Sequence, residues 1–458
     1  MNTPIVDFLN AYAASGISRL HMPGHKGHPF LGPEPLDITE IAGADELYAP
    51  EGIIAESERN ATALFGTAAT LYSTEGSSHG IRSMLILAKQ HYDRENRNRI
   101  LAARNVHKAF IYALAILGCE AEWIYPSASA ENSIAACQPT PERLREALMH
   151  CKIAGRMPFA VYVTSPDYLG QVADIAGLSA VAGEYNLPLL VDGAHGAYLR
   201  FLPESRHPMD LGAAMCCDSA HKTLPVLTGG AYLHLSRETA DRSAAKTAME
   251  MTGTTSPSYL IMASLDLCNR MLAETFPRQL ATLVHRLDTL REELRAEGIP
   301  ILSAEPMKIV VNSAEMGYTG KELGDILRVH RVEPEFCDAD YLVCMLTPET
   351  EQEDLERLGR ALLEARHMRR ARRETTPLRL APLERFMGIR EAVFSRHEEV
   401  PLDAAEGRIC GAPTVSCPPA VPMAVSGERL TREAILRMKA YGKRSISVVA
   451  MSERERRI

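Results

Sequence analysis

The sequence has no long apolar run, no cysteines at the spacing of a metal or redox motif, and no N-terminal stretch that resembles a signal peptide. No stretch approaches the ~18 consecutive apolar residues that a membrane-spanning helix requires. Residues 1–10 lack the basic region followed by an apolar run that marks a signal peptide. The ten cysteines form no C-x-x-C pair, and none stands beside a histidine at zinc-finger spacing. From these absences we expect a cytoplasmic protein with reduced cysteines, no membrane contact and no bound metal.

An excess of positive charge is also missing. The chain has 50 Lys and Arg against 58 Asp and Glu, which gives a net charge of −8. Nucleic-acid binders usually carry a basic balance or a strong basic stripe. The one basic stretch, residues 366–373, continues a helical pattern and is better explained as the solvated face of that helix. We therefore expect no nucleic-acid partner.

What the chain does have is ordinary globular composition. Apolar residues make up 46% of its 458 residues and charged residues 24%. At ~150 residues per domain, this length corresponds to two or three domains. Such a chain can bury a large core without disulfides or metals.

Residues 56–235 alternate short apolar runs with amphipathic ones. The apolar runs predict buried strands at residues 70–73, 100–103, 121–125, 159–164, 187–192 and 229–235. The amphipathic runs predict helices at residues 79–92, 107–117, 141–151 and 175–185. Thr140 can cap the third of these helices, with Pro141 in its first turn. The alternation predicts an α/β fold with a mostly parallel sheet, and the last strand is a candidate to run against the others.

The second half of the chain predicts a smaller α+β domain. One long helical pattern runs from residue 259 towards residue 297, where Gly298 and Pro300 end it. A strand (309–312), a helix (321–330), a strand (341–346) and a helix (349–366) follow. A proline-rich stretch, residues 413–422, then precedes a helix that begins near Thr431.

Polar residues at the carboxyl ends of the predicted strands are the candidates for chemistry, because open α/β sheets bind ligands there. Three segments qualify: residues 74–80 (TEGSSHG), 104–108 (RNVHK) and 191–196 (VDGAHG). A fourth candidate, residues 218–223 (DSAHKT), lies ~30 residues beyond Asp192, which is about one βα unit. The first could cradle a phosphate at the start of a helix, and the last holds a lysine in a tight turn.

Each segment also has a purely structural interpretation. The first could be a serine-capped turn, Asp192 could cap the turn after its strand, and His107 could cap the helix it begins. Lys222 could be a solvated surface charge. Taken together, however, a phosphate cradle, a strand-end Asp, a His able to stack and a turn Lys are the groups that bind pyridoxal 5'-phosphate.

The chain resembles the ornithine/lysine/arginine decarboxylase family in its short form, without the N-terminal wing domain. The matching motifs are HMPGHKG (21–27), PEG (50–52), RNVHK (104–108), TSP (164–166), VDGAHG (191–196), SAHKTLP (219–225) and TTSPSY (254–259). The resemblance implies the aspartate-aminotransferase-like fold, with a mostly parallel seven-stranded sheet. It also implies decarboxylation of a basic amino acid, arginine, lysine or ornithine, to its amine and CO₂.

The resemblance implies a role for each matching residue. Lys222 would hold the cofactor as a Schiff base, Asp192 would pair with its pyridinium nitrogen, and His107 would stack on the ring. These three are the expected catalytic residues. The other expected cofactor-binding residues are Gly76, Ser77, Ser78, Ala194, His195, Ser219, His221 and Ser256, the last of which would reach the phosphate in the neighbouring subunit.

The resemblance further implies a homodimer or higher oligomer with shared active sites. It suggests an N-terminal segment (1–55), a large cofactor domain (56–275), a small domain (276–375) and a C-terminal region (376–458). The sequence departs from the family pattern at Glu75, Ala412 and Cys417, which leaves the residue that recognises the substrate side chain unassigned. Aminotransferase or β-eliminating lyase chemistry, and a non-catalytic cofactor-binding paralogue, remain alternatives.

Overall fold

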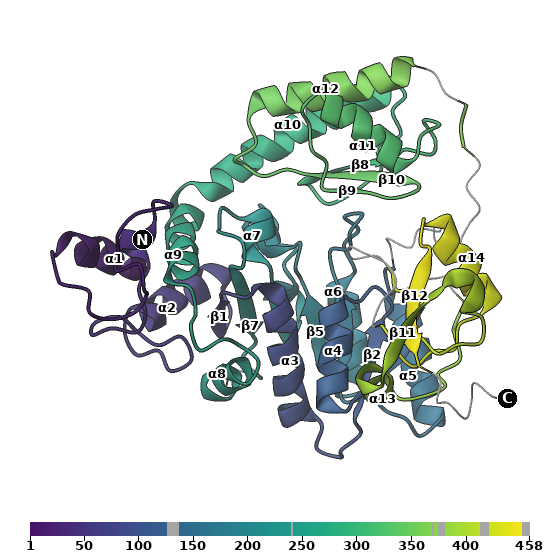
Figure 1. Ribbon diagram of the computed structural model, residues 1–458, viewed down its shortest axis with the longest axis horizontal. Coiled ribbons are helices and arrows are strands. Elements are labelled where there is room, and N and C mark those ends of the chain that lie inside the picture. The colour runs from purple at the N-terminus through teal and green to yellow at the C-terminus, as the bar shows by residue number, and fades with distance from the viewer. Residues whose placement is uncertain (126–136, 240, 369–370, 374–380, 413–420, 451–458) are drawn as a thin grey trace. The chain divides into compact units, whose positions relative to one another are not determined.

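The chain divides into two compact units. The computed structural model describes residues 1–125, 137–239, 241–368, 371–373, 381–412 and 421–450. The first unit comprises residues 1–97, 159–165 and 174–281, and the second comprises residues 98–158, 166–173 and 282–458. Figure 1 shows the order of the elements along the chain. Among the described residues, no helix has both the length and the apolar composition needed to cross a membrane.

The largest sheet has seven strands in the order β1-β7-β6-β5-β4-β2-β3. The strands are β1 (Ala69–Ser73), β2 (Arg99–Ala103), β3 (Glu120–Ile124), β4 (Val161–Thr164), β5 (Leu189–Asp192), β6 (Met215–Asp218) and β7 (Ala231–Leu235). The pairs β2/β3, β4/β5 and β5/β6 are parallel, whereas β7 is antiparallel to both of its neighbours. The predicted α/β fold and the reversed last strand are confirmed.

Strand β6 is absent from the predicted strands, although residues 214–217 are recognisably apolar. The strand is four residues long, and two of them are cysteines. Cysteine is not among the β-branched and aromatic residues that mark strands most strongly. Its pairing with β5 and β7 therefore decides its conformation.

The predicted helices of the first half are confirmed within a few residues. Helices of this part are α1 (Pro4–Ala14), α2 (Ile53–Phe65), α3 (Gly76–Tyr92), α4 (Lys108–Leu117), α5 (Pro141–Ile153), α6 (Ile175–Glu184), α7 (Ala220–Thr223) and α8 (Arg242–Glu250), with short 3₁₀ turns at Glu34–Leu36, Ala197–Phe201 and Pro208–Leu211. Thr140 caps α5 as predicted, since its side chain accepts the Arg143 N–H at 3.3 Å. Within the first unit, α3 packs along β6 and β7 (Figure 1).

The single long helix predicted for residues 259–297 is wrong, because the structure has two helices there. Helix α9 (Tyr259–Glu274) ends at Thr275, whose φ of −123° and ψ of −37° lie outside helical geometry. Helix α10 (Phe276–Ala296) then begins with Pro277 in its first turn. Proline has no N–H and disfavours continuous helix before it, but it fits the start of a new helix.

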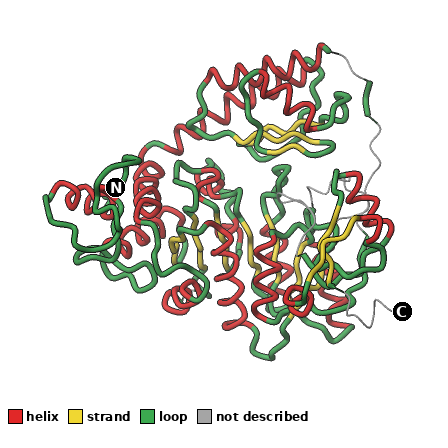
Figure 2. The backbone as a smooth tube through the Cα atoms, in the orientation of Figure 1, coloured by secondary structure: helices red, strands yellow, loops and turns green. Residues whose placement is uncertain are grey.

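The second unit contains two smaller sheets, whose strands are the yellow tube segments of this part of the chain in Figure 2. One is antiparallel in the order β8-β10-β9, and the other pairs β11 with β12. Their elements are β8 (Lys308–Asn312), α11 (Gly320–Val329), β9 (Phe336–Cys337), β10 (Tyr341–Met345), α12 (Gln352–His367), α13 (Ile389–Phe394), β11 (His397–Pro401), a 3₁₀ turn (Leu402–Ala404), α14 (Arg432–Ala440) and β12 (Ser445–Val449). The predicted α+β order and the helix after Thr431 are confirmed.

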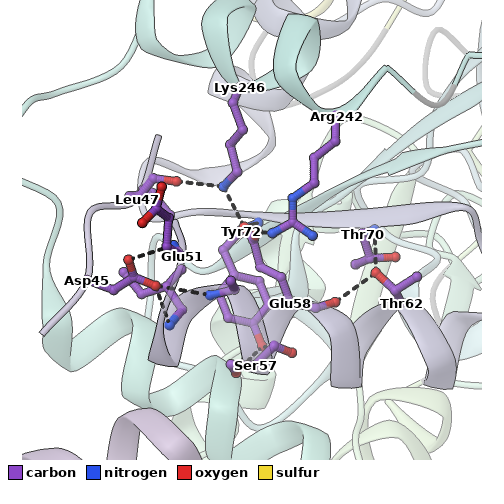
Figure 3. Close-up of polar contacts among 12 residues, drawn as sticks. Asp45, Leu47, Glu51, Ser57, Glu58, Thr62, Thr70, Tyr72, Arg242 and Lys246 are labelled. Carbon is purple, nitrogen blue, oxygen red and sulfur yellow. Dashed lines mark hydrogen bonds and ion pairs between the residues drawn. The ribbon is translucent and has the colours of Figure 1, made fainter. Parts of the chain in front are cut away.

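Strand β1 lies at one edge of the large sheet, and helix α2 satisfies its outward-facing backbone. The Tyr72 N–H donates to the Glu58 carboxylate at 2.9 Å, and two residues earlier the Thr70 N–H donates to Thr62 Oγ1 at 2.9 Å (Figure 3). An edge strand with unpaired N–H groups would otherwise be a template for unwanted pairing. Side chains of α2 therefore close this edge.

The buried charge of Glu58 is balanced by two cations from helix α8. Lys246 Nζ lies 2.6 Å from one carboxylate oxygen and Arg242 Nη2 lies 2.5 Å from the other (Figure 3). Lys246 also donates to the Leu47 carbonyl at 2.7 Å. A buried carboxylate is tolerated only when it is paired in this way. The three side chains thereby tie α8, α2 and the N-terminal segment together.

Candidate functional site

Asp192 ends strand β5 and lies almost completely inside the protein, with 2% of its surface exposed. Its carboxylate accepts the Ala194 N–H at 3.1 Å and the Tyr162 hydroxyl at 3.3 Å. Burial raises the pKa of Asp192, and the nearby charge of Lys222 acts in the opposite direction, together with these two hydrogen bonds. The site therefore holds a carboxylate that is desolvated but has the partners to carry a charge.

Lys222 is brought to the same region as predicted. It lies on the short helix α7 directly after β6, and its Nζ is 3.2 Å from His195 Nε2. His195 follows β5, which pairs in parallel with β6 so that Asp192 stands opposite Cys217. The carboxyl ends of two neighbouring strands thus bring an amine, an imidazole and a carboxylate into one region of the first unit.

Two of the four serines predicted to bind the phosphate are in direct contact. Ser219 Oγ donates to Ser77 Oγ at 2.7 Å, although 142 residues separate them. Ser77 lies in the first turn of α3, and Gly76 before it has a φ of +71°, which an L-residue rarely adopts. The Gly76 N–H donates to the Gly229 carbonyl at 2.7 Å, so it fixes the turn rather than pointing at a ligand.

His221 and Ser78 lie beside this pair of serines. His221 Nδ1 donates to the Gly230 carbonyl at 3.0 Å, and burial lowers the pKa of the ring. A Cβ placed on Gly76 would lie 3.8 Å from His221 Cε1, which shows how near the ring is to the turn. Ser78 is half-buried one residue further along α3.

Ser256 is not gathered with the other predicted residues. It is exposed, and its N–H donates to Thr254 Oγ1 at 3.1 Å. The Thr254 N–H in turn donates to the Glu75 carboxylate at 2.6 Å. Glu75, one of the departures from the family pattern, therefore links the Ser256 loop to the turn that precedes Ser77 and Ser78. The departure at Cys417 lies outside the described residues.

His107 belongs to the second unit. Its Nδ1 accepts the Ala109 N–H at 3.2 Å, so it caps helix α4 as the structural interpretation proposed. This bond fixes the ring orientation relative to the helix it begins. The role of His107 towards a cofactor stays a prediction.

Asp218, a buried carboxylate for which the sequence predicts no role, directly precedes Ser219 at the end of β6. Asp218 Oδ2 accepts from Nε2 of His207 at 2.9 Å and of His234 at 3.1 Å, and all three side chains are fully buried. Burial raises the pKa of Asp218, but the charges and hydrogen bonds of the two histidines outweigh it and hold that pKa well below its usual range. Asp218, like Asp192, ends an apolar strand, so the same reasoning about costly buried carboxylates could have found it.

The grouping around Asp218 also includes the only set of metal-ligand types that lie close together among the described residues. Ligand atoms of His207, Cys216 and Asp218 lie within 4.8 Å of one another. Hydrogen bonds join these atoms, since Cys216 Sγ donates to Asp218 Oδ1 at 3.5 Å. The prediction of no bound metal stays a prediction.

The first unit contains the donor set that pyridoxal phosphate needs. Two adjacent serine hydroxyls suit its phosphate, a buried carboxylate suits its ring nitrogen, and a lysine amine suits its aldehyde. The contacts of Ser77 with Ser219 and of Lys222 with His195 show that separate motifs converge here. The residues present therefore fit the cofactor.

Comparison with known proteins covers nearly the whole chain. Residues 3–311 match the family profile described as "Orn/Lys/Arg decarboxylase, major domain", and residues 368–443 match the profile of its C-terminal domain. A curated arginine decarboxylase of Bacillus subtilis is 30% identical, in an alignment that covers 94% of this chain and 92% of that protein. The arginine decarboxylase of Bacillus anthracis is 28% identical, with 94% and 91% covered.

Solved structures show the same fold. The lysine decarboxylase of Francisella novicida aligns with a TM-score of 0.80 at 16% identity, covering 98% of this chain and 81% of that one. Lysine decarboxylase A of Pseudomonas aeruginosa aligns with a TM-score of 0.80 at 17% identity, covering 98% and 80%. At these identities the likeness establishes the fold alone.

Proposed function

This chain belongs to the Orn/Lys/Arg decarboxylase family, and from that premise we propose that it is a pyridoxal-phosphate-dependent arginine decarboxylase. The reaction converts the amino acid to the corresponding amine and CO₂. We choose arginine because curated relatives named arginine decarboxylase align with more than nine-tenths of the chain. The proposal that the chain binds pyridoxal phosphate rests on one observation: Lys222, Asp192 and the Ser77–Ser219 pair lie in the same unit.

When bound, pyridoxal phosphate supplies a conjugated ring that accepts the electron pair left by departing CO₂. We assign Lys222 to hold the cofactor covalently, and Ser77, Ser219 and His221 to bind its phosphate. Asp192 keeps a proton on the ring nitrogen, because a carboxylate in a low-dielectric site strongly favours a positive partner.

A proton must return to Cα after CO₂ leaves. Lys222, whose amine stands 3.2 Å from His195, is the group we assign to deliver it. His195 is buried next to that amine and restricts the conformations that the Lys222 side chain can adopt. The two residues together hold the proton donor close to the end of β5, where Asp192 lies.

We also propose a homodimer with shared active sites. The exposed position of Ser256, on a loop fastened by Glu75, leaves that hydroxyl available to a neighbouring subunit. The boundaries near residues 55, 275 and 375 remain our proposed domain limits.

Product analysis tests the proposed reaction. Purified protein supplied with pyridoxal phosphate is incubated with arginine, lysine, ornithine and neutral amino acids, and CO₂, amine and keto acid are measured. We expect CO₂ and amine in equal amounts from arginine and no keto acid. Keto acid without CO₂ would identify an aminotransferase or a lyase, and bound cofactor without turnover would identify a non-catalytic protein.

A further inference from the structure

Arg104 follows strand β2 in the second unit and is the largest fully buried charged side chain there, with 1% of its surface exposed. Its backbone N–H donates to the Ile124 carbonyl at 3.0 Å, which extends the β2/β3 ladder by one residue. Its guanidinium carbon lies 4.8 Å from the Trp123 ring centroid and 5.4 Å from that of Tyr125. Trp123 lies in β3 and Tyr125 directly follows it, so the two rings are two residues apart at the end of the strand.

The partner of Arg104 comes from more than 300 residues further along the chain. Nη1 and Nη2 donate to Oε1 and Oε2 of Glu428, each at 2.7 Å, and Nε donates to the Pro422 carbonyl at 3.2 Å. The Glu428 carboxylate is also buried and accepts the Val425 N–H at 2.8 Å. Such a two-pronged pair fixes direction as well as charge, and only arginine provides its planar fork.

The turn fixed by this pair leads directly to His107. The Arg104 carbonyl accepts the Val106 N–H at 3.0 Å, and His107, the next residue, caps helix α4. Because the Arg104 side chain is held in place, it fixes the backbone of residues 104–106, which leads to His107. The anchor itself lies in residues 368–443, which match the family's C-terminal domain.

We propose that Arg104 and Glu428 are positioning residues through which the C-terminal domain holds His107 in the orientation needed to stack on the cofactor. The inference rests on the proposed function, because it takes His107 as a cofactor-binding residue. It assigns the C-terminal domain a part in cofactor binding that does not require it to contact the cofactor.

A local readout exists in the protein without cofactor, since Trp123 is the only tryptophan of the chain. Glu428→Gln removes the charge that holds the guanidinium over the Trp123 ring, so the emission of Trp123 should change. Glu384→Gln is the matched control, because Glu384 forms an exposed ion pair with Arg429 in the same domain. Unchanged emission in Glu428→Gln would show that Arg104 stays in place without its partner and would overturn the proposal.

The decisive experiment is a double-mutant cycle on the dissociation constant of pyridoxal phosphate. We expect Glu428→Gln and His107→Ala each to weaken binding about tenfold, and the double variant to be weakened by little more than either one. Additive effects, about a hundredfold together, would show that Glu428 acts independently of His107 and would overturn the proposal. Glu384→Gln should bind the cofactor like the wild type.

Arg104→Lys provides the same cycle if Glu428→Gln does not fold, because it keeps the positive charge and loses only the fork. Paired with His107→Ala, it should again give non-additive losses, and additive losses would again contradict the inference. Failure of the proposed function gives a different result. In that case the wild type would not bind pyridoxal phosphate, or would bind it and release no CO₂ from arginine.

Discussion

The pKa of Asp192 depends on its burial and on three nearby groups, the Tyr162 hydroxyl, the Ala194 N–H and the Lys222 amine. If Asp192 pairs with the ring nitrogen as we propose, removing its charge should leave the cofactor attached to Lys222 and still slow the reaction. We expect Asp192→Asn to lower kcat for CO₂ release by at least ~100-fold, in line with the loss of one preorganised electrostatic group. Retained cofactor absorption with kcat within a few-fold of wild type would contradict this role.

The Tyr162 hydroxyl tests the protonation of Asp192. It donates to the ionised carboxylate at 3.3 Å and so lowers the pKa of Asp192. In the proposed role of Asp192, activity requires the ionised form, so we expect activity to be lost as pH falls through that pKa. In Tyr162→Phe the pKa rises, and the acid limb of the kcat profile should move to higher pH. Tyr185→Phe, at the end of α6, is the control in which the limb should not move.

At this scale the sequence was most informative where a motif follows a strand. The positions of Lys222, Asp192, Ser77 and Ser219 were all expected, and the structure gathers them in one unit. The bond from Thr254 to Glu75 was not foreseeable, because 179 residues separate the two and neither residue type indicates a partner.

Helix α2 depends on a single side chain outside it. Both carboxylate oxygens of Asp45 accept backbone N–H groups around the start of the helix, from Glu51, Gly52, Ile54 and Ala55 at 2.8–3.2 Å. These are N–H groups that a helix cannot satisfy internally. Asp45 therefore fixes the N-terminal segment to the helix whose side chains close the edge of β1.

Asp45→Ala should destabilise the protein more than the loss of an ordinary cap. We expect a fall of about 2 kcal/mol in the free energy of unfolding, the upper end for helix caps, measured by urea denaturation. Asp241→Ala provides the comparison, because Asp241 caps α8 through one hydrogen bond, to the Ala244 N–H, and should cost about 1 kcal/mol or less. Equal losses in the two variants would show that the additional bonds contribute nothing.

Helices and strands were predicted correctly where the hydrophobic period and the capping residues agree. The prediction failed where pairing with neighbouring strands decides the conformation. The interval from 141 to 151 has a cap, a first-turn proline and an amphipathic period, and it is a helix as expected. Residues 215–218 have no such local signal, and they become a strand because β5 and β7 flank them. Pro277 indicates the break between α9 and α10 at Thr275, but the hydrophobic period continues across it and predicts one helix.

Three buried carboxyl groups make the stability of the whole molecule depend on pH. Burial raises the pKa values of Asp167, Asp266 and Asp338 to about 6 each. Because these folded-state values exceed the ordinary value of 3.8, the folded protein binds more protons than the unfolded chain between the two values. Their stabilising contribution is complete below pH ~4 and is lost as pH rises through about 6.

Asp266 offers the cleanest measurement of this effect. Its carboxylate lies at the start of α1, where it accepts the N–H groups of Ile5 and Val6. Asp266→Asn cannot titrate, so its free energy of unfolding should fall less steeply between about pH 4 and pH 6. The difference in slope should reach up to ~1.4 kcal/mol per pH unit. Asp174→Asn, at the exposed cap of α6, is the control. Parallel slopes for wild type and Asp266→Asn would contradict the raised pKa.

The most direct test of the central claim is the release of labelled CO₂ from carboxyl-labelled arginine by the wild type and by Lys222→Ala, each supplied with pyridoxal phosphate. We predict that the wild type releases one CO₂ for every amine formed, and that Lys222→Ala, which cannot hold the cofactor covalently, releases none above background. Release by Lys222→Ala at the wild-type rate, or no release by the wild type from any basic amino acid, would contradict the account.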